Sequence, residues 1–358
     1  MILLALNTFK GVMPSYKVSK YIEDGITYQD SSAECRVLSV SDGGDGFIHS
    51  LDGKGFERKK IETINPVGEY QTSEILINLN EKLAVLEIAK ISGINSFNYK
   101  ESNQLMANST GVGMAIDFCL KNGIENIVLG LGGSGISDLG IGAGHFLGLR
   151  FFDKRGSSIS FDSNKFDLAN VLKIEHIDTR LFEQAFSNVK LYLASDVFNP
   201  LLGHNGSATI FSPNKGSSLS EIDKISKIHI YYSDLIKKEL DKDMNVRMAG
   251  AAGGFSSSFL FLPGVELLHG FDYVRRRINL DEIVKESDLV ITGEGTFDKT
   301  TLYGKLPFSI SELSKKYCRP IFGVFGKYDL NMSREIFDFS LVLNDLKNYN
   351  GNFRDDYY

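Results

Sequence analysis

Lysine and aspartate residues that could handle phosphate groups follow the first two apolar runs of this chain. Lys10 comes directly after the apolar run at 2–7, and Asp42 and Asp45 come after the run at 35–40, in the sequence SDGGDG. A lysine ammonium suits phosphate or carboxylate, and carboxylates at a strand end suit Mg²⁺, which needs only one or two of them. The structural alternatives are a surface lysine and a turn with helix-capping aspartates.

The densest glycine cluster, GLGGSGISDLGIGAG, covers residues 130–144 and contains Asp138. Successive backbone N–H groups that lead into a helix form a cradle for anions. The segment 130–135 also matches GxGxxG after a strand, which is the pattern of a dinucleotide-binding turn. A nicotinamide enzyme is therefore one alternative, although this pattern alone is a weak signal.

Two further clusters follow apolar runs in the second half of the chain. Asp196 ends the run at 191–196, and Lys215 lies beside a glycine in FSPNKG. A structural role explains these residues equally well: Asp196 could cap the start of a helix, and Lys215 could lie in an exposed turn.

In ITGEGTFDKTTLYGK, Glu294 lies between Gly293 and Gly295, and Asp298 follows. An acid between two glycines at the end of a strand is not what a buried turn requires, so this cluster favours a functional role.

The elements that must position these clusters are strands alternating with helix-length segments, which predicts an α/β fold with mostly parallel sheets. Residues 69–89 break this rhythm, because they predict two strands around a turn at Asn80 and hence a mixed sheet. The strand-like runs at the two chain ends resemble each other. We therefore predict a discontinuous domain of 1–66 plus 286–358 with a second α/β domain, 67–285, inserted; consecutive domains are the alternative.

Length, net charge and cysteine content limit the kinds of protein that this chain can be. A chain of 358 residues favours two domains. Its formal net charge of -6 argues against a nucleic-acid or anionic-membrane partner. Three scattered cysteines and the lack of a run of 18 apolar residues predict a cytoplasmic protein without a membrane span. The oligomeric state stays open, with a homodimer as one possible state.

The ordered motifs resemble one family. NTFKG, SDGGDG, EIAKISGI, STGVG, GLGGSGISDLG, SDVFNPLLG, AGAAGGF and ITGEGTFD are similar, in order from about residue 2 to about residue 327, to motifs of the bacterial type of glycerate kinase. The resemblance implies two α/β domains, one flavodoxin-like and discontinuous, with the active site in the cleft between them. It also implies transfer of a phosphoryl group from ATP to glycerate with Mg²⁺, with 2-phosphoglycerate as the usual product.

The chain departs from the family pattern at four places: Asn7 stands where the family has an aspartate, Ile136-Ser137 where it has threonine-asparagine, Thr296 where it has arginine and Thr300 where it has glutamine. An arginine lost from a site for an anionic substrate removes a bidentate clamp. A kinase of another small hydroxy or sugar acid, and a catalytically impaired paralogue that acts as a ligand-binding regulator, are therefore alternatives.

Phosphoryl transfer depends on positioning and charge neutralisation more than on covalent chemistry, which suggests a role for each cluster. Asp196 is the first candidate for the base that accepts the substrate hydroxyl proton, and Asp138 is the second. Lys10 completes the predicted catalytic group. The predicted nucleotide-binding residues are Gly132, Gly133, Ser134, Lys215, Gly293, Glu294 and Gly295, and the predicted metal ligands are Asp42, Asp45 and Asp298.

Overall fold

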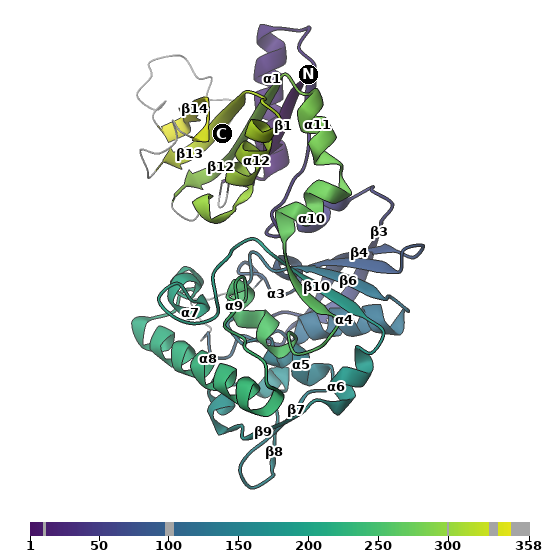
Figure 1. Ribbon diagram of the computed structural model, residues 1–358, viewed down its shortest axis with the longest axis vertical. Helices are drawn as coiled ribbons and strands as arrows, with labels where there is room; N and C mark the ends of the chain where they lie inside the picture. Colours follow the sequence, from purple (N-terminus) through teal and green to yellow (C-terminus); the bar gives the residue numbers. More distant parts are fainter. Residues whose placement is uncertain (10–11, 97–103, 299–300, 329–335, 345–358) are drawn as a thin grey trace. The chain divides into compact units, whose positions relative to one another are not determined.

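The computed structural model describes residues 1–9, 12–96, 104–298, 301–328 and 336–344 (Figure 1). The chain divides into two compact units: unit 1 consists of Met1–Ser41 and Arg275–Tyr358, and unit 2 of Asp42–Val274. This division differs from the predicted limits at 66 and 286. The segment 57–64 belongs to unit 2 because it hydrogen-bonds into the sheet of that unit.

The described residues of unit 1 form a five-stranded parallel sheet. Its strands are β1 (Ile2–Leu6), β2 (Cys35–Val37), β12 (Leu289–Phe297), β13 (Ile321–Tyr328) and β14 (Phe339–Val342). Their spatial order is β2-β1-β12-β13-β14. Counted along unit 1, this is the order 2-1-3-4-5, which is the flavodoxin-like arrangement.

The helical segments of unit 1 are α1 (Ser15–Gln29), α11 (Leu280–Glu286), η5 (Thr301–Tyr303) and α12 (Leu306–Lys316), while α10 (Gly270–Arg277) begins in unit 2 and ends in unit 1. Helix α1 packs on β1 and α12 packs on β12 (Figure 1). Leu4, Leu6, Ile291 and Val324 are buried with Val18 of α1 in one apolar core. Continuous apolar strands of this kind are typical of a sheet that is covered by helices.

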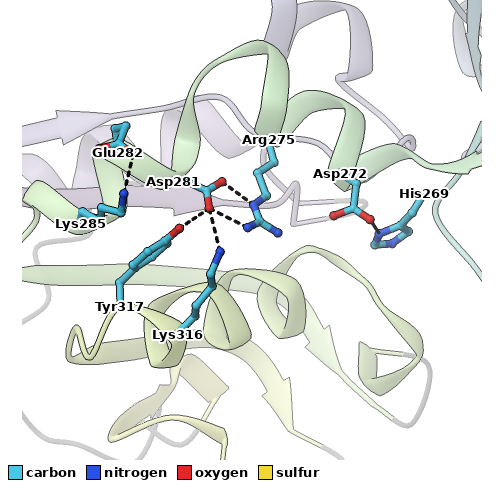
Figure 2. Close-up of polar contacts among 8 residues, drawn as sticks. All are labelled: His269, Asp272, Arg275, Asp281, Glu282, Lys285, Lys316 and Tyr317. Carbon is cyan, nitrogen blue, oxygen red and sulfur yellow. Dashed lines mark hydrogen bonds and ion pairs between the residues drawn. The ribbon is translucent and has the colours of Figure 1, made fainter.

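An ion pair joins the helical elements of unit 1 beside the sheet. Asp281 accepts hydrogen bonds from Arg275 Nε at 2.6 Å and Nη2 at 2.7 Å, and from the Tyr317 hydroxyl at 2.5 Å (Figure 2). The Arg275 guanidinium holds the pKa of the Asp281 carboxyl well below its usual range. A bidentate pair of this kind fixes the relative position of the segments that carry it.

The main sheet of unit 2 has six strands in the described residues, in the order β11-β10-β6-β5-β4-β3. They are β3 (Glu57–Ile64), β4 (Tyr70–Asn78), β5 (Leu83–Glu87), β6 (Asn126–Gly130), β10 (Lys190–Ser195) and β11 (Val265–His269). Strands β5, β6, β10 and β11 are parallel, whereas β4 runs antiparallel to both of its neighbours, β3 and β5. The predicted mixed sheet and the predicted hairpin at 69–89 are confirmed.

A small antiparallel sheet of β7 (Arg150–Phe152), β8 (Ser158–Ile159) and β9 (His176–Asp178) completes the strands described in unit 2. The helices described in unit 2 are α2 (Phe47–Leu51), α3 (Ile88–Ser92), α4 (Thr110–Lys121), α5 (Ile141–Phe146), α6 (Arg180–Ala185), α7 (Ser207–Phe211), α8 (Leu219–Leu240) and α9 (Ala251–Gly254). The 3₁₀ segments are η1 (Ser163–Lys165), η2 (Leu168–Lys173), η3 (Pro213–Lys215) and η4 (Phe255–Ser258).

The longest helix of unit 2, α8, shows why its sequence folds as it does. Its first residues form a capping box, in which Ser218 accepts a hydrogen bond from the Glu221 N–H while Glu221 accepts one from the Ser218 N–H. Its apolar face buries Ile225, Ile228 and Tyr232 in the core of the unit. A defined start and one apolar stripe are the two signals that specify a surface helix.

Candidate active site

The parallel strands of the unit 2 sheet end side by side, and this alignment fixes where the following loops meet. Glu87 of β5 and Ala194 of β10 both lie opposite Gly130 of β6, and Ser195 lies opposite His269 of β11. Open α/β sheets bind ligands outside the carboxyl ends of their parallel strands. The loops after these four strands therefore form the candidate site of unit 2.

Two glycine loops touch at this edge. The Gly132 N–H donates to the Gly43 carbonyl at 2.9 Å, and a Cβ on Gly132 would lie 2.3 Å from Gly44 Cα and 2.6 Å from Asp196 Oδ2. A Cβ on Gly44 would in turn lie 3.2 Å from Asp42 Oδ1 and 3.4 Å from Asp196 Oδ2. Only glycine permits backbones and carboxylates to approach so closely. The loops carrying Asp42 and Asp196, far apart in the sequence, thus meet at the glycine-rich loop.

Asp45 joins the same group through Gly133. That glycine has φ +73°, and a Cβ on it would lie 2.5 Å from Asp45 Oδ1. Within the described residues, no three His, Cys, Asp or Glu side chains are arranged as a ready-made metal site. Carboxylates such as Asp42 and Asp45 nevertheless fit Mg²⁺, which keeps several waters and takes its remaining ligands from substrate phosphates.

Asp138 is fully buried beneath the glycine-rich loop and has four donors around its carboxylate. It accepts hydrogen bonds from the Ser109 N–H at 2.8 Å, the Ser109 hydroxyl at 2.7 Å, the Gly142 N–H at 3.1 Å and the Gly140 N–H at 3.2 Å. Burial raises the pKa of Asp138, and these hydrogen bonds oppose that effect. The carboxylate thereby joins the first residues of α4 to those of α5 and shapes the loop between β6 and α5.

Lys215 lies under the same loop. Its Nζ donates to the Ile136 carbonyl and lies 3.4 Å from Ser134 Oγ, and the residue is only 6% exposed. Burial lowers the pKa of Lys215 to about 7. His229 of α8 donates from Nε2 to the Ser137 carbonyl at 3.0 Å, and burial lowers the pKa of His229 to about 4, so its ring is neutral at pH 7. These two side chains support the loop from its protein side.

The lowered pKa of Lys215 makes the stability of the fold depend on pH. Between pH 7 and 10.5 the unfolded chain binds more protons at this group than the folded chain, so the free energy of unfolding rises with pH in that window. We expect the wild type to gain about 2–3 kcal/mol between pH 7.5 and 9.5 relative to Lys215→Met, at about 1.4 kcal/mol per pH unit. Urea denaturation at both pH values measures the difference.

The matched control for this measurement is Lys224→Met, which removes an exposed lysine from α8 and should leave the pH dependence of the wild type intact. If Lys215→Met and the wild type gain the same stability between the two pH values, the buried lysine is not the group that titrates.

Glu87 is a residue of the site that the sequence reasoning missed. Its buried carboxylate at the end of β5 accepts hydrogen bonds from the Gly46 N–H at 3.1 Å and the Ile48 N–H at 3.0 Å. Burial raises the pKa of Glu87. The carboxylate holds the first turn of α2, directly after the loop that carries Asp45. The available signal was an acidic residue that closes the apolar run LAVLE.

In unit 1, the carboxyl ends of β1 and β12 adjoin at the point where the strand order reverses, which is where flavodoxin-like sheets bind ligands. The Asn7 N–H donates to the Gly293 carbonyl at 2.8 Å. Glu294 is buried and accepts a hydrogen bond from the Thr301 hydroxyl at 2.6 Å. Asp298 Oδ1 lies 3.8 Å from Lys305 Nζ. The predicted residues Gly293, Glu294, Gly295 and Asp298 therefore share one edge of this sheet.

The predicted site residues thus form two groups, each within its own unit. Asp42, Asp45, Gly132, Gly133 and Asp196 contact one another in unit 2, while Ser134, Asp138 and Lys215 form the support beneath the loop. Lys10 and Thr300 lie outside the described residues. Among the helices that the structure describes, none combines the length and the apolar character needed to cross a lipid bilayer.

Glycine-rich loops beside acidic side chains at the carboxyl ends of parallel strands fit a nucleotide-dependent phosphotransferase of the α/β class. Comparison with known proteins agrees with this class. The family model described as "Glycerate kinase family" matches residues 2–341.

Two similar proteins are a glycerate kinase of Halalkalibacterium halodurans, 31% identical over 91% of this chain and 85% of the relative, and a glycerate 2-kinase of Escherichia coli K12, 33% identical over 91% and 84%. A solved structure of a glycerate kinase 2 from Salmonella typhimurium LT2 superposes with a TM-score of 0.76 at 27% identity, covering 95% of this chain and 89% of that one. The chain belongs to the glycerate kinase family and is an ATP-dependent phosphotransferase.

Proposed function

We propose that this protein phosphorylates glycerate at the 2-hydroxyl, with ATP as the donor and 2-phosphoglycerate as the product. The observation that carries the proposal is the contact of the Asp196 and Asp42 loops with the glycine-rich loop at the carboxyl edge of the unit 2 sheet. Relatives of similar length are a glycerate kinase and a glycerate 2-kinase, which supports the substrate and the position of transfer.

The N–H groups of Leu131, Gly132 and Gly135 already donate to backbone carbonyls. In the proposed mechanism, the backbone N–H groups of Gly133 and Ser134 hold phosphate oxygens of the nucleotide. Asp196 accepts the proton of the substrate hydroxyl as its oxygen attacks the γ-phosphorus and the bond to the ADP oxygen breaks. Asp138 and Lys215 keep the loop in position and do not contact the reacting atoms. Such positioning is the main protein contribution to phosphoryl transfer.

Mg²⁺, when bound together with ATP, neutralises developing phosphate charge. Asp42 and Asp45 are the ligands that we propose for it in unit 2, because they offer the hard oxygen atoms that this ion prefers. Asp298 of unit 1 remains a sequence prediction for the same role.

A coupled ADP-release assay over hydroxy acids of three to six carbons tests the proposal, with ³¹P NMR of the product. Phosphate on the 2-oxygen couples to one vicinal proton and gives a doublet, whereas phosphate on the 3-oxygen couples to two and gives a triplet. We expect ADP release with D-glycerate and a doublet.

Release with a sugar acid but not with glycerate would keep the reaction and replace the substrate. A triplet would move the transfer to the 3-hydroxyl. Ligand binding without ADP release from any acid would favour a regulatory protein, the alternative that Asn7 and Thr296 suggest.

A further inference from the structure

An arginine, a phenylalanine and a histidine lie against one another at the carboxyl edge of the unit 2 sheet. The guanidinium carbon of Arg247 lies 3.9 Å from the centroid of the Phe198 ring. The other neighbour of that ring is His269, at a centroid distance of 4.9 Å and an interplanar angle of 36°. His269 Nδ1 lies 3.5 Å from Asp272 Oδ2 (Figure 2). The Phe198 ring is therefore held in place and carries a cation.

These three residues lie beside the loops that carry Asp42 and Asp196. Phe198 lies two residues after Asp196, in the loop that follows β10. His269 ends β11, and the next residue, Gly270, is so close that a Cβ on it would lie 2.3 Å from the Asp42 carbonyl oxygen. Arg247, in the segment between α8 and α9, thus lies over a residue of the loop that carries Asp196.

The backbone fixes the base of Arg247 as well. The Met248 N–H donates to the Phe198 carbonyl at 3.2 Å, and the Gly250 N–H donates to the Asn199 carbonyl at 2.9 Å. Met248 adopts φ 73°, a left-handed conformation that is uncommon for a residue with a side chain. The segment therefore holds the arginine against the loop after β10 at some cost in backbone strain.

Three of the other arginines of unit 2 have partners elsewhere, and the fourth, Arg155, lies in a different turn. Arg58 pairs with Asp52 and Glu74, Arg180 pairs with Asp178, and Arg150 donates to two carbonyls. Arg155 is exposed in the turn between β7 and β8. Arg247 is exposed, makes no salt bridge with any described residue, and lies at the carboxyl edge of the parallel strands.

We propose that Arg247, supported by the Phe198 ring, binds the carboxylate of the substrate and thereby selects 2-hydroxy acids over neutral alcohols. The proposal rests on the proposed function and names the group that recognises the acid. The N–H groups of a guanidinium lie in one plane, and a carboxylate can accept two of them at once.

Kinetics and calorimetry of Arg247→Gln test this assignment. We expect the KM and the Kd for D-glycerate to rise about 10- to 100-fold, since a charge-assisted hydrogen-bonded pair contributes about 1.5–3 kcal/mol. The KM for ATP and the kcat at saturating glycerate should stay within about threefold. Arg247→Lys should keep part of the affinity, because lysine keeps the positive charge. The recovery should be incomplete, because lysine lacks the planar fork that binds both carboxylate oxygens.

Arg155→Gln is the matched control, because it removes the same charge from an exposed position and should leave the glycerate constants unchanged. Wild-type turnover with an unaltered KM in Arg247→Gln would overturn the carboxylate subsite and leave the proposed function intact. Arg247-dependent binding of D-glycerate without ADP release would keep the subsite and overturn the proposed function. Absence of D-glycerate binding to the wild type would overturn both.

Discussion

Asp196→Asn is expected to lower kcat for glycerate phosphorylation by about 10²- to 10⁴-fold, which is the contribution of a general base. The asparagine keeps the shape of the side chain, so the close approach of Gly44 and Gly132 survives and the melting temperature should change little. What is lost is the acceptor for the hydroxyl proton. Initial rates at saturating ATP, together with a thermal melt, measure both quantities.

Asp138→Asn provides the contrast, because it also neutralises an aspartate next to the loop. The asparagine offers one acceptor oxygen to the donors of Ser109, Gly140 and Gly142. Its other terminal group, an NH₂, is itself a donor and cannot accept their hydrogen bonds. We expect it to lower the free energy of unfolding by about 2–4 kcal/mol, since hydrogen bonds to a charged group contribute about 1.5–3 kcal/mol each.

Turnover of Asp196→Asn within about tenfold of the wild type would assign the base to another residue.

Gly132→Ala is expected to abolish most activity, with kcat/KM falling by about 100-fold or more. The new Cβ would lie 2.3 Å from Gly44 Cα, a backbone atom that cannot turn aside as a side chain can. One of the two glycine loops must then move, and a displacement of about 1 Å at reacting groups costs about 100-fold in rate. The melting temperature should fall as well, because the contact is between backbones.

Gly25→Ala is the matched control, since the same Cβ in α1 would meet no heavy atom within 4 Å. It should stabilise the protein by about 0.5–1 kcal/mol through the higher helix propensity of alanine, with unchanged activity. If Gly132→Ala kept half of the wild-type kcat/KM, the close contact of the two loops would not be part of the working site.

The clusters that the sequence made visible are those in which residue type alone carries the signal. Glycines at 43–44 and 132–133 are informative because no other residue allows their contacts, and an acid after an apolar strand is informative because parallel strands end together. The mixed sheet was also predictable from residue types, because two strand-like segments of residues 69–89 flank a residue, Asn80, that is favourable in turns. The fold class therefore follows from local patterns.

The roles of individual charged residues did not follow, because partners far along the chain decide them. Asp138 resembles a catalytic acid in sequence, and only the Ser109 contacts reveal that its carboxylate is saturated. Lys215 resembles a phosphate ligand, yet it is buried against the Ile136 carbonyl. The division near residue 41 was missed because β3 looks like any strand until its pairing with β4 is known.

The pairing of β1 with β12 has a consequence for biosynthesis. Ile2 lies opposite Leu289 in the register of that ladder, so β1 has no partner on this side until the chain has been synthesised as far as β12. The intervening unit 2 can collapse on its own core in the meantime. Because contacts between distant positions close slowly, completion of the discontinuous unit should be the late step of maturation, and nascent chains truncated before Leu289 should expose β1 to chaperones.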